Sequence, residues 1–462
     1  MATRSCSLMM RSALIIFSIT LGIGSPLFAE PLPIDPLWKS EGFRKTVTGS
    51  YGIDSRIEPR ITVDEEFYIA ESAKAMADND RKKAAQILSD SPLLEKSAAL
   101  QFNLATLRLE DGNSEAALKA FESALEKFPN FRDAHRNLAV VLVRENEFEK
   151  AREHLVRAIE LGAGDGLTIG LLGYCHSQDG NAQAALSAFR MAALTQPNER
   201  QWKIGEAEAL QSLDYHREAN SIFQSVIDEK PDDLNLWRVQ ADALISLENY
   251  NAAIANLEFA YRAKDLPPVA ILSLGHLYLQ GDLPDLALQR YKAAISAEEK
   301  PVELSRVLIA VEMLTSQQQF SRARQLIDAV ETAEYDLDSE ENKTEVGKLI
   351  RSRAFIELED GDAAKGAQAL EKWVKTDGTD GLALILLARF KENANQREEA
   401  EMLLEQAALI PDHEAEALFA HGRLLVDARD YEAALEKLEK AAAIDPRPRI
   451  TNYLEAVREL VK

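Results

Sequence analysis

Residues 166–199, GLTIGLLGYCHSQDGNAQAALSAFRMAALTQPNE, contain the pattern that decides the fold of this chain. A small residue at Gly173 is followed twelve positions later by Ala185, then by a bulky Phe189, and the stretch closes near Pro197. The same frame returns every 34 residues in six consecutive units. A fixed period of this length is typical of repeat architectures in which each unit is one supersecondary element.

Each unit consists of two short amphipathic runs with a polar break between them, as at residues 178–181. Small residues on two facing helices let the backbones approach, and the bulky residue fills the space beside them. Proline ends the second helix because it cannot continue the hydrogen-bond ladder. One such pair cannot bury its own apolar face, so neighbouring units must stack. A helical bundle with coincidental spacing is the alternative, and six units in one register argue against it.

These units resemble the tetratricopeptide repeat family. The resemblance implies an all-α fold, a TPR-type α-solenoid: a right-handed superhelix of antiparallel helix pairs with about 10–11 repeats and a concave, peptide-binding face. The predicted divisions are a signal peptide at 1–29, an extended N-terminal arm at 30–65, a TPR array at 66–335 with strict register over 98–301, an acidic loop at 336–346, C-terminal TPR units at 347–448 and a capping helix at 449–462. The acidic loop lies where the register slips by two residues, and either a hinge between two arrays or a simple solvated loop fits it.

Charge and motifs disfavour several functions. The formal net charge is −23, with 76 acidic and 53 basic residues. We therefore do not expect the clusters of Lys and Arg side chains that bind nucleic acid or anionic membrane surfaces. The acidity fits either solubility alone or a basic partner segment. No zinc-protease, P-loop or paired-cysteine motif occurs. We therefore expect no catalytic residue, no metal site and no cofactor, and a glycine-rich turn where residues 162–166 join two units.

The first 29 residues predict export. Arg4 and Arg11 precede an apolar run that ends at the small residue Ala29, as in a cleaved signal peptide. An uncleaved anchor helix is the alternative, although the run is shorter than the ~20 apolar residues of a spanning helix. Loss of Cys6 with the leader leaves Cys175 alone, so a buried structural thiol is expected and a redox role is disfavoured.

The arm differs in composition from the repeats, with several prolines and the aromatic residues Trp38, Phe43 and Tyr51. It either docks on the first repeats or stays free to bind. Together with the string at residues 170–174, this arm is similar to that of exported TPR proteins found with TonB–ExbB–ExbD systems. That resemblance implies a periplasmic accessory protein that docks on a TonB-type complex in a Gram-negative bacterium.

Partner-binding residues follow from the phase of the repeat. In the family that the chain resembles, the first helix of each unit faces the groove at its second, fifth, ninth and twelfth positions. Those positions predict the groove residues Phe102, Arg136, Tyr174, Glu208, Arg238, Asp242 and His276. For each of them, a solvated side chain with no binding role is the alternative, and the sequence favours it. The ninth positions lack the asparagine that grips a C-terminal carboxylate in chaperone-binding members, which disfavours that function.

Three functions remain open. The first is a non-catalytic protein-interaction scaffold in the periplasm, as an accessory of a TonB-type uptake complex. The second is an assembly factor for envelope polysaccharide export or outer-membrane protein biogenesis. An enzyme carrying a solenoid is the least favoured, because the arm and the repeats leave no residues for a catalytic domain.

Overall fold

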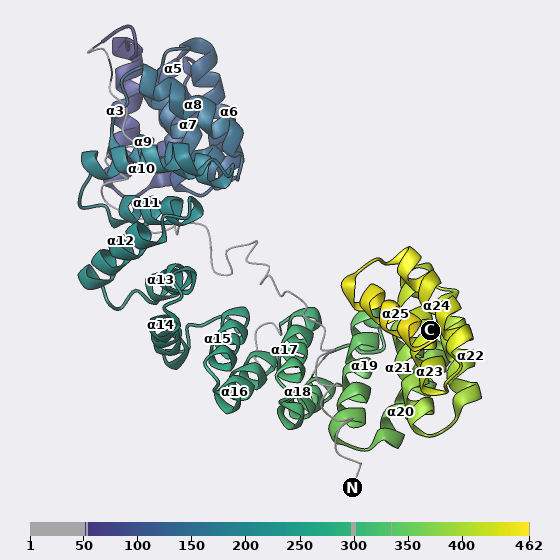
Figure 1. The fold of residues 1–462 in the computed structure, drawn as a ribbon. Coiled ribbons are helices and arrows are strands. Elements are labelled where there is room, and N and C mark those ends of the chain that lie inside the picture. Colours follow the sequence, from purple (N-terminus) through teal and green to yellow (C-terminus); the bar gives the residue numbers. More distant parts are fainter. Residues whose placement is uncertain (1–50, 52–53, 297–301, 334, 462) are drawn as a thin grey trace. The chain divides into compact units, whose positions relative to one another are not determined.

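The computed structural model describes residue 51 and residues 54–296, 302–333 and 335–461. The predicted signal peptide, Trp38 and Phe43 lie outside the described residues. Within them, the chain forms 23 α-helices and no strand (Figure 1). Successive helices pair through turns of a few residues, which places the two members of a pair antiparallel. The structure is therefore the all-α, TPR-type solenoid that the repeat pattern predicts, while the right hand of the superhelix stays a prediction.

The helices have these bounds: α3 Val63–Ala77, α4 Arg81–Ser89, α5 Ala98–Glu110, α6 Ser114–Lys127, α7 Arg132–Arg144, α8 Phe148–Glu160, α9 Gly166–Gln178, α10 Ala182–Thr195, α11 Arg200–Ser212, α12 His216–Glu229, α13 Leu234–Ser246, α14 Tyr250–Arg262, α15 Pro268–Gln280, α16 Pro284–Ile295, α17 Leu304–Ser316, α18 Phe320–Thr332, α19 Lys343–Asp360, α20 Ala363–Thr376, α21 Gly381–Asn393, α22 Arg397–Ala408, α23 Glu414–Asp427, α24 Tyr431–Ile444 and α25 Pro448–Leu460. Three 3₁₀ turns, Leu94–Lys96, Glu340–Asn342 and Pro411–His413, lie between them.

The 34-residue period is visible in the helix starts. The first helices of six consecutive units begin at residues 98, 132, 166, 200, 234 and 268. The next one, α17, begins at Leu304, two residues late, which is the predicted slip of the register. The two extra residues therefore lie between the end of α16 at Ile295 and the start of α17, and not inside a helix.

The described residues divide into two compact units, one up to Arg262 and one from Ala263. This division lies inside the strict register and not at residues 336–342, where a hinge was one of the two alternatives. The acidic segment is also shorter than predicted, since the Glu340–Asn342 turn leads directly into α19 at Lys343. Similarly, the repeats begin at Val63 and not at 66, because Thr62 and Glu65 form a capping box.

Small residues set the contact between the helices of a pair, as the pattern predicts. A Cβ built on Gly173 would meet the ring of Phe189 at 3.0 Å, and one on Gly275 would meet Tyr291 at 2.4 Å. Phe189 and Tyr291 are themselves buried, and filling such a site with an aromatic ring stabilises the pair by roughly 2–3 kcal/mol. The spacing of small and large residues that recurs from unit to unit is therefore a packing requirement.

The turn within each pair repeats with the same period. One residue of each turn has a positive φ, and in six consecutive units it lies 34 residues from the last: Gly112, Asn146, Gly180, Asp214, Glu248 and Asp282. Glycine, asparagine and aspartate enter this left-handed region most readily. Glu248, with φ 58°, is the least suited of the six.

Candidate functional site

The seven predicted groove residues all lie on the first helices of their units, α5 to α15. The structure does not make them one surface. Phe102 and Arg136 lie beside the N-terminal segment, Tyr174, Glu208, Arg238 and Asp242 follow on α9, α11 and α13, and His276 belongs to the second compact unit.

Two of the aromatic predictions need correction. Phe102 is 1% exposed, and its ring centroid lies 4.8 Å from that of Phe131 and 5.7 Å from that of Phe121. It is a core residue and cannot contact a partner. Tyr174 is 6% exposed and packs edge-on against Phe148, so only a small part of its ring can contribute to a surface. Both positions lie where one unit stacks on the next, which the phase of a single helix does not reveal.

Glu208 on α11 lies in an unusual electrostatic environment. Its carboxylate forms no ion pair or hydrogen bond with any described residue. Burial raises the pKa of Glu208 to about 8, because the charged form loses water and gains no partner. Burial raises the pKa of the neighbouring Tyr174, and nearby acidic groups that include Glu208 raise it further.

Asp242 occupies the equivalent position on α13. Burial also raises the pKa of Asp242 to about 8, and Arg238, one turn earlier on the same helix, only partly opposes this. Arg238 is 7% exposed, and its guanidinium donates to Asn235 Oδ1 at 2.6 Å. Asp242 thus resembles Glu208 as a half-buried acid, although the charge of Arg238 acts on it from one turn away.

Gln211 adds a further acceptor on α11, three residues after Glu208. Its Oε1 is shielded from solvent and accepts no hydrogen bond within the described part of the chain. Residues three apart lie on the same side of a helix. The repeat position alone identifies Glu208 and Asp242. Gln211 stands at the twelfth position of α11, which is also a groove position of the repeat, but it was not among the predicted residues.

His276 does not join these residues. Its Nδ1 lies 2.9 Å from the hydroxyl of Tyr291, within the α15–α16 pair, and burial lowers the pKa of His276 to about 4. The prediction of His276 as a groove residue is corrected here, since its ring is bound within its own hairpin.

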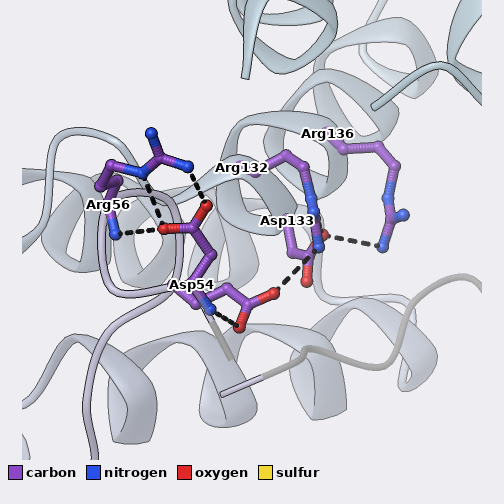
Figure 2. Close-up of polar contacts among 6 residues, drawn as sticks. Asp54, Arg56, Arg132, Asp133 and Arg136 are labelled. Carbon is purple, nitrogen blue, oxygen red and sulfur yellow. Dashed lines mark hydrogen bonds and ion pairs between the residues drawn. The ribbon is translucent and has the colours of Figure 1, made fainter. Parts of the chain in front are cut away.

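The arm is docked where it is described. Residues 54–58 form a turn against α7, and Tyr51 packs on the core of the first unit. The extended arm ends at Thr62, three residues before the predicted bound. Figure 2 shows Asp54 paired with Arg56, close to Arg132, Asp133 and Arg136 of α7. The buried carboxylate of Glu58 lies 3.5 Å from Arg132 Nη2. Among the residues of this contact, only Arg136 and Tyr51 were predicted. The charged residues in the first turn of α7 were the feature of the sequence that could have identified the others.

The described residues offer little for catalysis or metal binding. They contain no group of three or more His, Cys, Asp or Glu side chains that could hold a metal ion. Cys175 is buried, as predicted, and burial raises the pKa of its thiol to about 12. Among the described helices, none is both long and apolar enough to cross a membrane.

Comparison with known proteins agrees with the repeat architecture. Tetratricopeptide repeat family models match residues 102–166 and residues 415–448. Human protein O-mannosyl-transferase TMTC1 is 24% identical over 128 residues, which is 27% of this chain and 14% of that protein. The chain thus spans only a small part of the length of this curated relative.

Among solved structures, a tetratricopeptide repeat protein from Parabacteroides merdae is similar, with 20% identity and a TM-score of 0.39 over 56% of this chain and 100% of that one. MamA from Desulfovibrio magneticus RS-1 has 18% identity and a TM-score of 0.35 over 37% of this chain and 98% of its own. PilF of Pseudomonas aeruginosa has 18% identity and a TM-score of 0.36 over 43% and 90%. The paired helices, their small-residue contacts and the two matched stretches show that this chain is a tetratricopeptide repeat protein.

Proposed function

We propose that this chain is a non-catalytic interaction scaffold, and that the inner faces of α9, α11 and α13 bind a basic, extended segment of a partner protein. The observation that carries the proposal is the state of Glu208: a half-buried carboxylate without any hydrogen bond or ion pair from the described residues. A buried acid without a partner destabilises the fold, and such groups concentrate at functional sites.

A lysine or arginine side chain supplies what this face lacks. It provides donors for the carboxylates of Glu208 and Asp242 and for Gln211 Oε1. Charge-assisted hydrogen bonds of this kind are stronger than neutral ones. Since burial holds the pKa of both acids at about 8, each is mostly protonated at pH 7, and a bound cation drives the proton off. Binding of a basic segment should therefore release protons and strengthen as pH rises toward 8.

Calorimetric titration tests this. The probes are synthetic ten-residue peptides with two lysines spaced at different intervals, measured at pH 7 in two buffers that differ in ionisation enthalpy. We expect proton release with the full chain and its loss in Glu208→Gln and Asp242→Asn. Glu206→Gln is the matched control, because Glu206 lies on the same helix but is already paired with Arg190 at 2.9 Å. Equal binding of lysine and glutamate peptides would refute the proposed specificity.

We also propose that the scaffold works in the periplasm as an accessory of a TonB-type energy-transducing complex. Two features of the sequence support this: the leader of residues 1–29 and the aromatic, proline-containing arm that follows it. Affinity capture from envelope extract with the chain from residue 30, and again without residues 30–62, tests the assignment. Capture of TonB, ExbB or ExbD homologues that depends on the arm is the expected result. Capture of polysaccharide-export or outer-membrane assembly machinery instead would favour an assembly factor.

A further inference from the structure

Tyr51 and residues 54–59 lie against α5 and α7 much as a bound peptide would. Its aromatic end is anchored on α5, where Asn103 Nδ2 donates to the Tyr51 hydroxyl at 2.5 Å. The Tyr51 ring also meets Phe131 edge-on, with centroids 6.4 Å apart. Burial raises the pKa of Tyr51 well above its usual range, so the hydroxyl stays neutral and bound.

The other end of the segment is held by main-chain and ionic contacts. The amide of Arg132, the first residue of α7, donates to the Ile57 carbonyl at 3.2 Å. Glu58 is 4% exposed, and its carboxylate lies 3.5 Å from Arg132 Nη2. Pro59 beside it is also buried. An aromatic anchor, a main-chain hydrogen bond and a buried charge are the elements of peptide recognition.

Charge on α7 explains why the segment carries a glutamate. Asp133 pairs with Arg132 at 3.1 Å and with Arg136 at 3.7 Å, and the charge of Asp165 also acts on Arg136 (Figure 2). Glu58 places a further anion beside Arg132. A segment that leaves would expose an arginine site suited to a carboxylate, the opposite preference to that of the face formed by α9, α11 and α13.

We propose that the face of α5 and α7 that Tyr51 and Glu58 contact is a second peptide-binding site. Its ligand is a segment with an aromatic ring followed seven positions later by a glutamate, and Tyr51 and residues 54–59 occupy it within the same molecule. The competing ligand is a partner segment with this chemistry. A tethered segment acts at an effective concentration on the order of millimolar, so a free peptide meets a site that is mostly occupied. This inference is independent of the basic-segment site.

Fluorescence anisotropy with a labelled peptide of residues 51–61 provides the test. The full chain with Tyr51→Ser and Glu58→Lys releases its own segment, and we expect it to bind the peptide at least ~10-fold more tightly than the wild-type chain does. The same peptide carrying Glu58→Lys should not bind. Arg132→Glu in the released chain should abolish binding. Arg56→Ala is the matched control, because the Arg56 side chain is 85% exposed and pairs only with Asp54 within the segment.

Hydrogen exchange on the wild-type chain tests the site without any substitution. Residues 54–60 should be protected, and excess peptide should reduce that protection. The proposal is wrong if the released chain keeps wild-type helicity and does not bind the peptide. It is also wrong if the wild-type chain binds the peptide as tightly as the released chain does. A wild-type dimer that the peptide dissociates would overturn the closure within one molecule in favour of exchange between two copies.

Discussion

Replacing Glu208 by glutamine should stabilise this protein, and only above a defined pH. In the folded chain, burial shifts the pKa of Glu208 from its ordinary 4.5 to about 8. The unfolded state therefore releases its proton first as pH rises. The free energy of unfolding falls between about pH 4.5 and 8 and is constant above, because both states are then ionised. Glutamine resembles the protonated acid, so the free energy of unfolding of Glu208→Gln does not fall over this pH range.

The magnitude follows from the pKa. For a carboxyl wholly removed from water, a rise from 4.5 to about 8 corresponds to ~5 kcal/mol. Water reaches part of the Glu208 side chain, which reduces the penalty. We expect Glu208→Gln to exceed the wild type by about 2 kcal/mol at pH 9 and to match it at pH 4.

Hydrogen exchange of α11 is the suitable assay, since a repeat array does not unfold in one step. Fluorescence of Trp202, on the same helix, gives a second reading during urea unfolding. Glu206→Gln is the control and should slightly destabilise the chain, because it breaks the ion pair with Arg190. If Glu208→Gln gives the same difference at pH 4 and pH 9, or none at pH 9, the account of an uncompensated carboxylate is wrong.

Acid should loosen α7 and α8, because His135 and His154 share one contact between their Nδ1 atoms at 2.8 Å and burial lowers the pKa of His154 to about 4. This stability is present above the unfolded pKa of 6.5 and is lost as pH falls through about 4. His154→Gln should therefore weaken the pH dependence of local hydrogen-exchange protection over that range. Gly275→Val should destabilise its helix pair by about 1–3 kcal/mol in thermal unfolding, since even a Cβ would lie 2.4 Å from Tyr291; an unchanged Tm would contradict this. Glu248→Gly should raise stability by about 0.5–1 kcal/mol in urea titration, because the turn holds φ at 58°, and a lower midpoint would refute the strain.

The repeat period could be recognised in the sequence because every helix pair must meet the same packing requirement. Gly173 and Phe189 must meet wherever two backbones approach, so the same residue types recur at the same spacing. The slip at Leu304 was equally visible, because it moves every packing position together. Helix limits at the N-terminal edge were less clear, since the Thr62 capping box adds a turn that the apolar pattern does not require.

The candidate site was only partly predictable. Repeat phase located Glu208 and Asp242 on the helices that carry them. It could not show that burial raises the pKa of both carboxyl groups, because that depends on which side chains of other units surround them. The same phase misplaced Phe102, which the neighbouring Phe131 covers, and His276, which Tyr291 engages. The sequence did not identify the role of Glu58, since that role comes from Arg132, 74 positions away.

The sequence by itself determined the paired-helix solenoid, because every element of that fold depends on contacts between residues less than one period apart, such as Gly275 with Tyr291. The tertiary structure decided the division after Arg262, the docking of Tyr51 and Glu58, and the isolation of Glu208. These depend on desolvation and on partners brought together from distant parts of the chain, and neither quantity is encoded in local spacing.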